Sequence, residues 1–182
     1  KYTNDPERDP DYWSGGGRRW TLVFRWLTQD LHYYGIALRV SRELGLAFIV
    51  QTWSFALLTN GAIVALMVQG YVYETFVLIL IPSRLAIALL AATFDWLPHD
   101  PHEVESRDDR FRATSILIDP WLTPLFLFQN YHLIHHLYPA VPFYRYAKIW
   151  ELEKERLIER GARVRSVIPA RRVGQPARRV RE

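Results

Sequence analysis

Cysteine is absent from the 182-residue sequence. Its absence excludes disulfide bonds, thiolate zinc sites and cysteine-held iron–sulfur clusters, so histidine and carboxylate side chains remain as ligands for a tightly bound metal. An initiator methionine is also missing, and the polar start "KYTNDPERDPDYW" has neither the basic nor the apolar region of a signal peptide. We therefore expect the chain to be a piece of a longer protein.

Charged residues are missing from positions 44–69, a run of 26 residues. At about 1.5 Å per residue, a helix of this length crosses the roughly 30 Å hydrocarbon core of a bilayer. A second apolar stretch, 72–96, follows after almost no loop and is interrupted by "PSR" at Pro82 to Arg84. The pattern predicts two transmembrane helices in a tight hairpin, with a kink at Pro82 and with Arg84 facing the protein interior or reaching toward the membrane surface. The alternative is a buried helical hairpin in a soluble bundle, although soluble helices rarely run this long without a polar face.

Basic residues flank this hairpin on both sides and are missing from its tip. They are Arg18, Arg19, Arg25, Arg39 and Arg42 before it, and Arg107, Arg110 and Arg112 after it. Because basic residues mark the cytoplasmic side of a membrane protein, we expect both termini, and the histidines that follow the hairpin, in the cytoplasm.

The remaining segments are predicted to lie outside the hydrocarbon core. Residues 18–43 mix aromatic and basic side chains, which fits either a helix at the membrane surface or a soluble amphipathic helix. Residues 121–128 are too short to span and suggest an interfacial or re-entrant helix, and residues 150–160 suggest a charged surface helix. The arginine-rich tail, 161–182, is expected to be disordered and held near anionic lipid rather than bound to nucleic acid. The fold class is therefore all-α: an integral membrane hairpin with cytoplasmic or interfacial helices, in one domain over residues 1–160.

Histidine is rare but concentrated: three of the six residues, His132, His135 and His136, fall in "HLIHH". Residues three and four apart share a helix face, so these imidazoles can point to one side. A second pair in "PHDPH" follows the second apolar stretch. Three close imidazoles repel one another when protonated and have little packing value, which favours a metal site over a structural role. The candidate ligands are His99, His132, His135, His136 and, as a further candidate, His102. His32 has no neighbouring ligand and is expected to be structural.

These motifs resemble those of a known family. The box "HLIHH" after "FQNY", together with "FDWLPHDPH" at 94–102 near the end of a membrane hairpin, is similar to the C-terminal half of the fatty acid desaturase superfamily. The opening "TNDPERDPD" at 3–11 resembles the stretch that follows the second histidine box in the bacterial carotenoid-hydroxylase-like branch. The two upstream histidine boxes of the family are absent here, and the fragment interpretation would place them before Lys1.

The resemblance implies a membrane enzyme with two iron ions that uses dioxygen to hydroxylate or desaturate a C–H bond of a fatty acyl chain or carotenoid. His132, His135 and His136 would be iron ligands, and His99 would be the isolated ligand between the second and last boxes. Asp95 and Asn130, and also Asp100 and Glu103, are candidates for orienting these imidazoles, and each is equally well explained as a solvated or helix-end polar group. Desaturation, hydroxylation and ketolation are not separated by the sequence.

Electrons would come from an external, ferredoxin-like donor, because the chain has no nucleotide-binding glycine motif and no haem-binding signature. The basic cytoplasmic face suits an acidic partner. Two alternatives remain open: a membrane metal-handling or transport protein, and a non-catalytic remnant. With half of the ligand set, the isolated chain is expected to be inactive.

Overall fold

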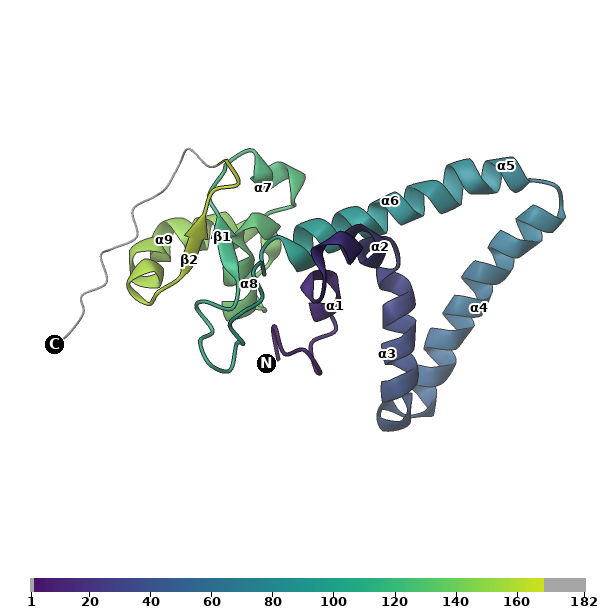
Figure 1. Cartoon of the computed structure of the whole chain (residues 1–182), viewed down its shortest axis with the longest axis horizontal. Coiled ribbons are helices and arrows are strands. Elements are labelled where there is room, and N and C mark those ends of the chain that lie inside the picture. The colour runs from purple at the N-terminus through teal and green to yellow at the C-terminus, as the bar shows by residue number, and fades with distance from the viewer. Residues whose placement is uncertain (1, 169–182) are drawn as a thin grey trace. The chain divides into compact units, whose positions relative to one another are not determined.

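The computed structural model describes residues 2–168 (Figure 1). It divides into two compact units. One comprises residues 2–12 and 93–168, and the other is Trp13–Ala92. The described chain is mostly helical, which confirms the predicted helical fold class.

The Trp13–Ala92 unit contains the predicted hairpin. Helix α4 covers Leu46–Val68, and a second long helix, Val72–Trp96, continues into the other unit. The turn between them includes Gly70 at φ 96°, a left-handed conformation that glycine adopts without a steric penalty. The expected spans of 44–69 and 72–96 are thus confirmed to within two residues.

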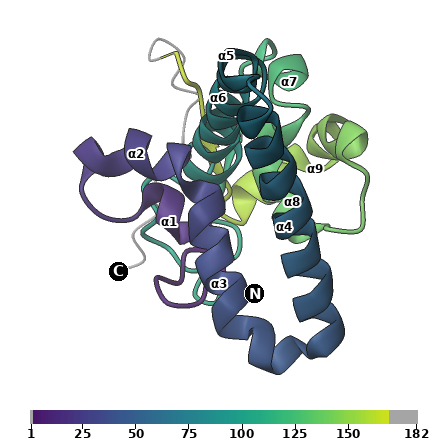
Figure 2. The ribbon, with the colours of Figure 1, turned by 90° about the vertical axis from the view of Figure 1, so that its right-hand side faces the viewer.

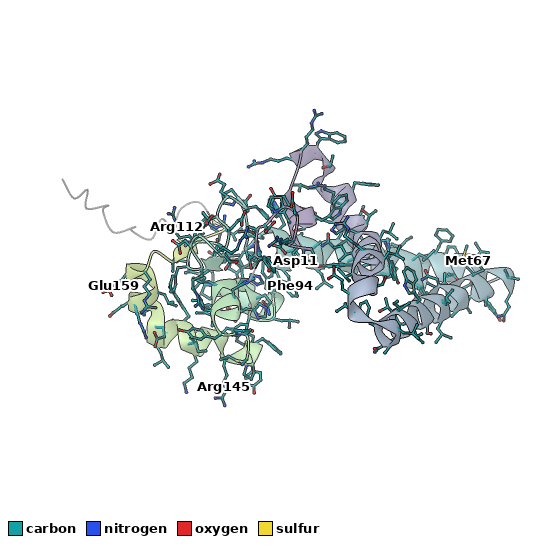
Figure 3. All side chains as sticks on the ribbon, turned by 90° about the horizontal axis from the view of Figure 1, so that it is seen from below. Asp11, Met67, Phe94, Arg112, Arg145 and Glu159 are labelled. Atoms are coloured by element: carbon teal, nitrogen blue, oxygen red, sulfur yellow. The ribbon has the colours of Figure 1, made fainter. Side chains whose placement is uncertain are left out.

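Both long helices are poorly covered by protein. Only 6% of the most apolar window of α4, and 11% of that of the second helix, is buried. In Figure 3 the side chains of the hairpin near Met67 are mostly hydrocarbon and project outward along the helices. A core helix of a soluble bundle would be mostly buried, so this exposure argues against the soluble alternative and in favour of lipid as the surrounding medium.

The second long helix is irregular around its proline. Helix α5, Val72–Thr75, leads into a π-helical stretch, Phe76–Leu80, and then into α6, Ile81–Leu90. The N–H of Ile81 donates to the carbonyl of Phe76, five residues back rather than four. Pro82 has no N–H and cannot donate an α-helical hydrogen bond. The sequence predicted a kink at this proline, and the structure has a π-helical turn immediately before it.

The predicted helix over 18–43 is divided. Following α1, Tyr12–Gly15, and a short 3₁₀ turn, helix α2 covers Leu22–Leu27 and α3 covers Gln29–Leu44. The break falls at Thr28, whose φ of −119° is not helical and whose hydroxyl donates to the carbonyl of Phe24. Helix α2 contacts α6, and α3 lies beside α4 (Figure 2).

The other unit is built around a small parallel sheet. Strand β1, Ser115–Leu117, pairs with β2, Arg163–Arg165, and every residue of β1 is buried. Three helices complete the unit: α7 at Leu122–Leu125, α8 at His132–Leu137 and α9 at Tyr146–Glu159. The main core consists of Ile116, Leu133, Ile134, Leu137, Tyr146, Trp150 and Leu157. This core fixes one face of α8 and so determines the direction of its histidines.

Three sequence expectations in this unit need correction or qualification. The tail does not become disordered at residue 161, because 163–165 add a strand beside β1, and the Ile118 N–H also donates to the Arg165 carbonyl. The rest of the predicted tail, 169–182, lies outside the described residues. The helix expected over 121–128 is a single turn, since Leu127 and Phe128 adopt positive φ angles of 47° and 65°. The surface helix begins four residues earlier than expected, at Tyr146.

Candidate metal centre

Helix α8 supplies two of the converging imidazoles. His132 and His136 are one helical turn apart, so they share a face, while Leu133, Ile134 and Leu137 pack into the core. The third imidazole, His99, comes from the turn after the second long helix, where its backbone N–H donates to the carbonyl of Trp96. A segment 33 residues upstream is therefore folded against α8.

The three Nε2 atoms meet at one point. Nε2 of His132 lies 3.0 Å from Nε2 of His99 and also 3.0 Å from Nε2 of His136. The ligand nitrogens of all three residues lie within 4.8 Å of one another. His99 and His132 are 3% and 7% exposed, so little water reaches this point.

The opposite ring nitrogens are each held by a polar partner. Nδ1 of His99 lies 3.0 Å from the side-chain oxygen of Asn4, and Nδ1 of His132 lies 3.1 Å from that of Gln129. Both partners are acceptors, so both Nδ1 atoms donate, and the two Nε2 atoms carry lone pairs. Nδ1 of His136 lies 3.3 Å from the hydroxyl of Thr3, which can accept or donate.

Burial keeps these imidazoles neutral. It lowers the pKa of His99 and of His132 well below the usual value, and the neighbouring histidines lower both further. Burial likewise lowers the pKa of His136 to about 4, with a further contribution from His135. Neutral imidazole is the form that binds metal ions.

The arrangement fits a metal ion. Two lone-pair nitrogens 3.0 Å apart repel each other unless a cation lies between them, and a shared proton could satisfy only one of the two Nε2 contacts at His132. Two imidazoles that bind one metal ion at right angles, each through a bond of about 2.1 Å, would have their ligating nitrogens about 3.0 Å apart. The observed Nε2–Nε2 distances have this value. Imidazole ligands suit iron, zinc, copper and nickel, so the donor set alone does not select the metal.

His135 lies beside this trio but points to a different partner. Its ring centroid is 5.5 Å from those of His132 and His136, and its Nδ1 lies 2.9 Å from the hydroxyl of Tyr146. Tyr146 is buried in the core, where burial also raises the pKa of its phenol. The fourth expected ligand is thus adjacent to the converging group without being a member of it.

The other histidines are placed differently. His102 packs against the ring of His99 at 5.8 Å between centroids, with Tyr12 against it at 5.9 Å, and it does not join the converging group. Burial lowers its pKa to about 4, opposed by Asp100. His32, which the sequence indicated to be structural, stacks on Trp13 at 4.6 Å in the other unit.

The polar residues expected to orient the imidazoles take several positions. Asn130 is fully buried, and its amide nitrogen donates to the carbonyl of Leu117 and to the hydroxyl of Thr123, which ties the short turn before α8 to β1. Asp95 is partly buried in the π-helical stretch 91–96, one turn before His99. Asp100 accepts from Arg165 at 3.4 Å, and Glu103 is exposed.

Four imidazole partners were missed in the sequence: Thr3, Asn4, Gln129 and Tyr146. Gln129 is three residues before His132, a helical spacing that offered a local signal. Asn4, followed by Asp-Pro, carries the signature of a turn, and no local pattern shows that its side chain reaches a residue 95 positions away.

The chain thus combines a buried cluster of three histidines with two long apolar helices. The chain belongs to the fatty acid desaturase family, because the family model described as "Fatty acid desaturase" matches residues 1–167. No curated protein and no solved structure matches the chain. Membership identifies an oxidoreductase of the desaturase or hydroxylase type that acts on lipids, and the two apolar helices agree with a membrane location.

Proposed function

We propose that this chain forms part of the histidine-rich di-iron centre of a membrane enzyme that uses dioxygen to hydroxylate or desaturate a lipid C–H bond. The observation that supports the proposal most strongly is the convergence of three Nε2 atoms from His99, His132 and His136. Family membership supplies the reaction class. The two irons and the choice of a fatty acyl or carotenoid substrate are parts of the proposal.

The residues divide naturally between two ions. His99, His132 and His136 would hold one ion through Nε2, since these atoms face one another. His135, with its Nδ1 engaged by Tyr146, would offer Nε2 to a second ion together with ligands from the upstream histidine boxes that the family resemblance implies. When bound, the irons would activate dioxygen with electrons from a donor and so supply the oxidant that removes hydrogen from an unactivated C–H bond.

The chain itself prepares the site for this chemistry. Asn4 and Gln129 accept from Nδ1 of His99 and of His132, which keeps the Nε2 lone pairs directed at the metal position. Burial lowers the pKa values of both imidazoles, so protons do not compete for these nitrogens near neutral pH. The hydrophobic core beneath α8 holds the helix rigidly and limits access of water.

The membrane hairpin would bring the substrate to this site. Only two residues separate the end of the second long helix at Trp96 from His99. This short connection supports the proposal that a lipid chain in the bilayer could reach a metal held by His99. We further propose that both termini and the histidine site face the cytoplasm, where the arginine-rich flanks would attract an acidic, ferredoxin-like electron donor.

The opening "TNDPERDPD" supports the carotenoid-hydroxylase-like branch as the more specific assignment. Thr3 and Asn4 of this stretch contact His136 and His99. That contact is the expected result if the stretch follows a histidine box in the natural protein. Hydroxylation, desaturation and ketolation differ in where the substrate carbon lies relative to the irons, and a product screen would separate them.

Metal content tests the proposal. The natural full-length protein, purified in detergent, should contain close to two irons per chain by mass spectrometry, and His132→Ala should lose them. With reductant and an electron donor, the iron-loaded protein should convert a lipid or carotenoid to an oxidised product. Zinc in place of iron would favour a metal-handling protein, and the absence of metal would favour a non-catalytic remnant.

A further inference from the structure

The structure assigns Thr3 and Asn4 a positioning role: the two adjacent side chains hold the Nδ1 atoms of His136 and His99, so that both Nε2 atoms face the metal position. This inference rests on the proposed metal centre. Thr3 and Asn4 lie outside the histidine motifs. Metal affinity would therefore depend on two residues that those motifs do not contain.

The orientation of the Asn4 amide is fixed by two backbone carbonyls. Its side-chain nitrogen donates to the carbonyl of Val104 at 2.8 Å and to that of Ala113 at 2.7 Å. These two bonds use both hydrogens of the amide. Turning the amide over would place its oxygen against two carbonyl oxygens, so the oxygen must face Nδ1 of His99, 3.0 Å away.

This fixed acceptor selects one tautomer of His99. A neutral imidazole has one N–H, and an acceptor at Nδ1 requires that hydrogen to be on Nδ1. Nε2 then carries a lone pair directed at Nε2 of His132. Asn4 and His99 are 2% and 3% exposed, so no bulk solvent is available to replace the bond. The carbonyls of Val104 and Ala113 thus fix the Asn4 amide, and the amide oxygen fixes the tautomer in which His99 can bind a metal through Nε2.

The local backbone keeps this side chain in place. Asn4 has a φ of 65°, in the left-handed region that asparagine tolerates better than most residues. Its N–H donates to the carboxylate of Asp9 at 2.6 Å. The preceding residue is tied as well, because the Thr3 carbonyl accepts from the N–H of Ser106 at 3.1 Å.

Thr3 extends the same arrangement to the second imidazole. Its hydroxyl lies 3.3 Å from Nδ1 of His136, and the residue is 8% exposed. His99 and His136 are far apart in sequence and come from a turn and from α8. One dipeptide therefore holds two ligands from separate segments, which fixes their relative position before a metal binds.

A second buried asparagine offers a matched control. Asn130 also donates two hydrogen bonds from its amide nitrogen, one of them to a backbone carbonyl, and it is fully buried. Its amide nitrogen donates to Leu117 and Thr123, and neither is an imidazole. If a buried amide mattered only for the fold, alanine at either position would have the same effect on metal binding.

The experiment measures the affinity of the full chain for Co(II) in detergent, by competition with a chelator and from the visible spectrum of the bound ion. We expect Asn4→Ala to bind Co(II) about 10–100-fold more weakly than the unchanged chain, the usual effect of removing a partner of a ligating histidine. Asn4→Asp keeps an acceptor for Nδ1 of His99 but places its second oxygen against the carbonyls of Val104 and Ala113, so it should weaken binding as well. Asn130→Ala should retain the affinity to within about threefold.

The outcomes separate a positioning role from a structural one. A loss in Asn130→Ala equal to that in Asn4→Ala would show that only the fold is affected and would overturn the inference. Full affinity in Asn4→Ala would overturn it while leaving the metal centre intact. No Co(II) binding by the unchanged chain would reject the metal centre itself, and the inference with it.

Thr3 provides a second test if circular dichroism shows that an Asn4 variant is unfolded. Thr3→Val replaces the hydroxyl with a methyl of similar size, and Thr3→Ser restores a hydroxyl. Weaker Co(II) binding in Thr3→Val with recovery in Thr3→Ser supports the positioning role. Equal affinity in both variants would count against it.

Discussion

Arg84, in the second long helix, donates hydrogen bonds to both carboxylate oxygens of Asp30 in α3, 54 residues earlier in the chain. The Nη1–Oδ1 distance is 2.8 Å, and the same Nη1 also donates to the carbonyl of Leu27 at 3.1 Å. A guanidinium in an apolar span is costly unless it is paired. The sequence indicated that Arg84 would face the interior or reach toward the surface, and its partners show that it is bound to neighbouring protein.

This pair predicts that removing one partner destabilises the hairpin more than removing both. Asp30→Ala leaves the charge of Arg84 with the Leu27 carbonyl alone, and we expect a loss of about 1–3 kcal/mol in the free energy of unfolding. The two side chains are 37% and 29% exposed, which favours the lower end of that range. The double variant Asp30→Ala/Arg84→Leu should recover part of the loss.

Denaturant titration in micelles, followed by tryptophan fluorescence, measures all three variants and gives the coupling energy of the pair. Additive losses in the double variant would mean that the ion pair contributes nothing to stability.

The sequence predicted those features that depend on local patterns. The two spans followed from uninterrupted apolar runs, and the convergence of His132 and His136 followed from their spacing of four on a helix. Strand β2 was not recognised, because "RVR" in a basic tail resembles a solvated segment and acquires its structure from pairing with β1, 48 residues upstream. Asn4 was missed for the same reason. Its role depends on contacts with His99 and with two carbonyls more than 95 residues away.

His132→Ala and His135→Ala should affect metal binding differently. Nε2 of His132 is 3.0 Å from both other Nε2 atoms, so its loss leaves only two converging ligands. We expect His132→Ala to remove Co(II) binding by the chain and His135→Ala to leave one ion bound. If the proposed function holds, both substitutions should also abolish iron-dependent turnover in a protein that carries the upstream histidine boxes. If His135→Ala also removed the single Co(II) ion, the ligand set of three would have to be enlarged.

Tyr146 should matter for the orientation of His135. Tyr146→Phe removes the hydroxyl that lies 2.9 Å from Nδ1 and keeps the ring that packs in the core. The expected cost is about 1 kcal/mol in the free energy of unfolding, the usual net contribution of one hydrogen bond. If the proposed di-iron centre forms, the iron content of a protein with the upstream histidine boxes should fall from two toward one, because only the His135 side of the site loses its support. An unchanged iron content would show that His135 is held by other contacts.

Acidification should destabilise the metal-free chain below pH about 6.5. His102 and His136 each have a usual pKa of 6.5, which burial lowers to about 4. Between these values the unfolded chain binds protons that the folded chain rejects, so protons favour unfolding. The stabilisation is fully present above pH 6.5 and is lost progressively as the pH falls toward 4. Each such proton contributes a slope of about 1.4 kcal/mol per pH unit.

Thermal unfolding in detergent between pH 7.5 and 4 measures this dependence. His102→Gln removes one of the imidazoles with a lowered pKa and keeps the three converging histidines, so its stability should fall less steeply with pH than that of the unchanged chain. The groups that act most on His102 apart from burial are Asp100, which raises its pKa, and Arg165, which lowers it. Asp100→Asn should therefore lower the pKa of His102 further and steepen the loss of stability near pH 4. A transition temperature independent of pH across this range would mean that these imidazoles bind protons equally in the folded and unfolded chains, and it would contradict the lowered pKa values of His102 and His136.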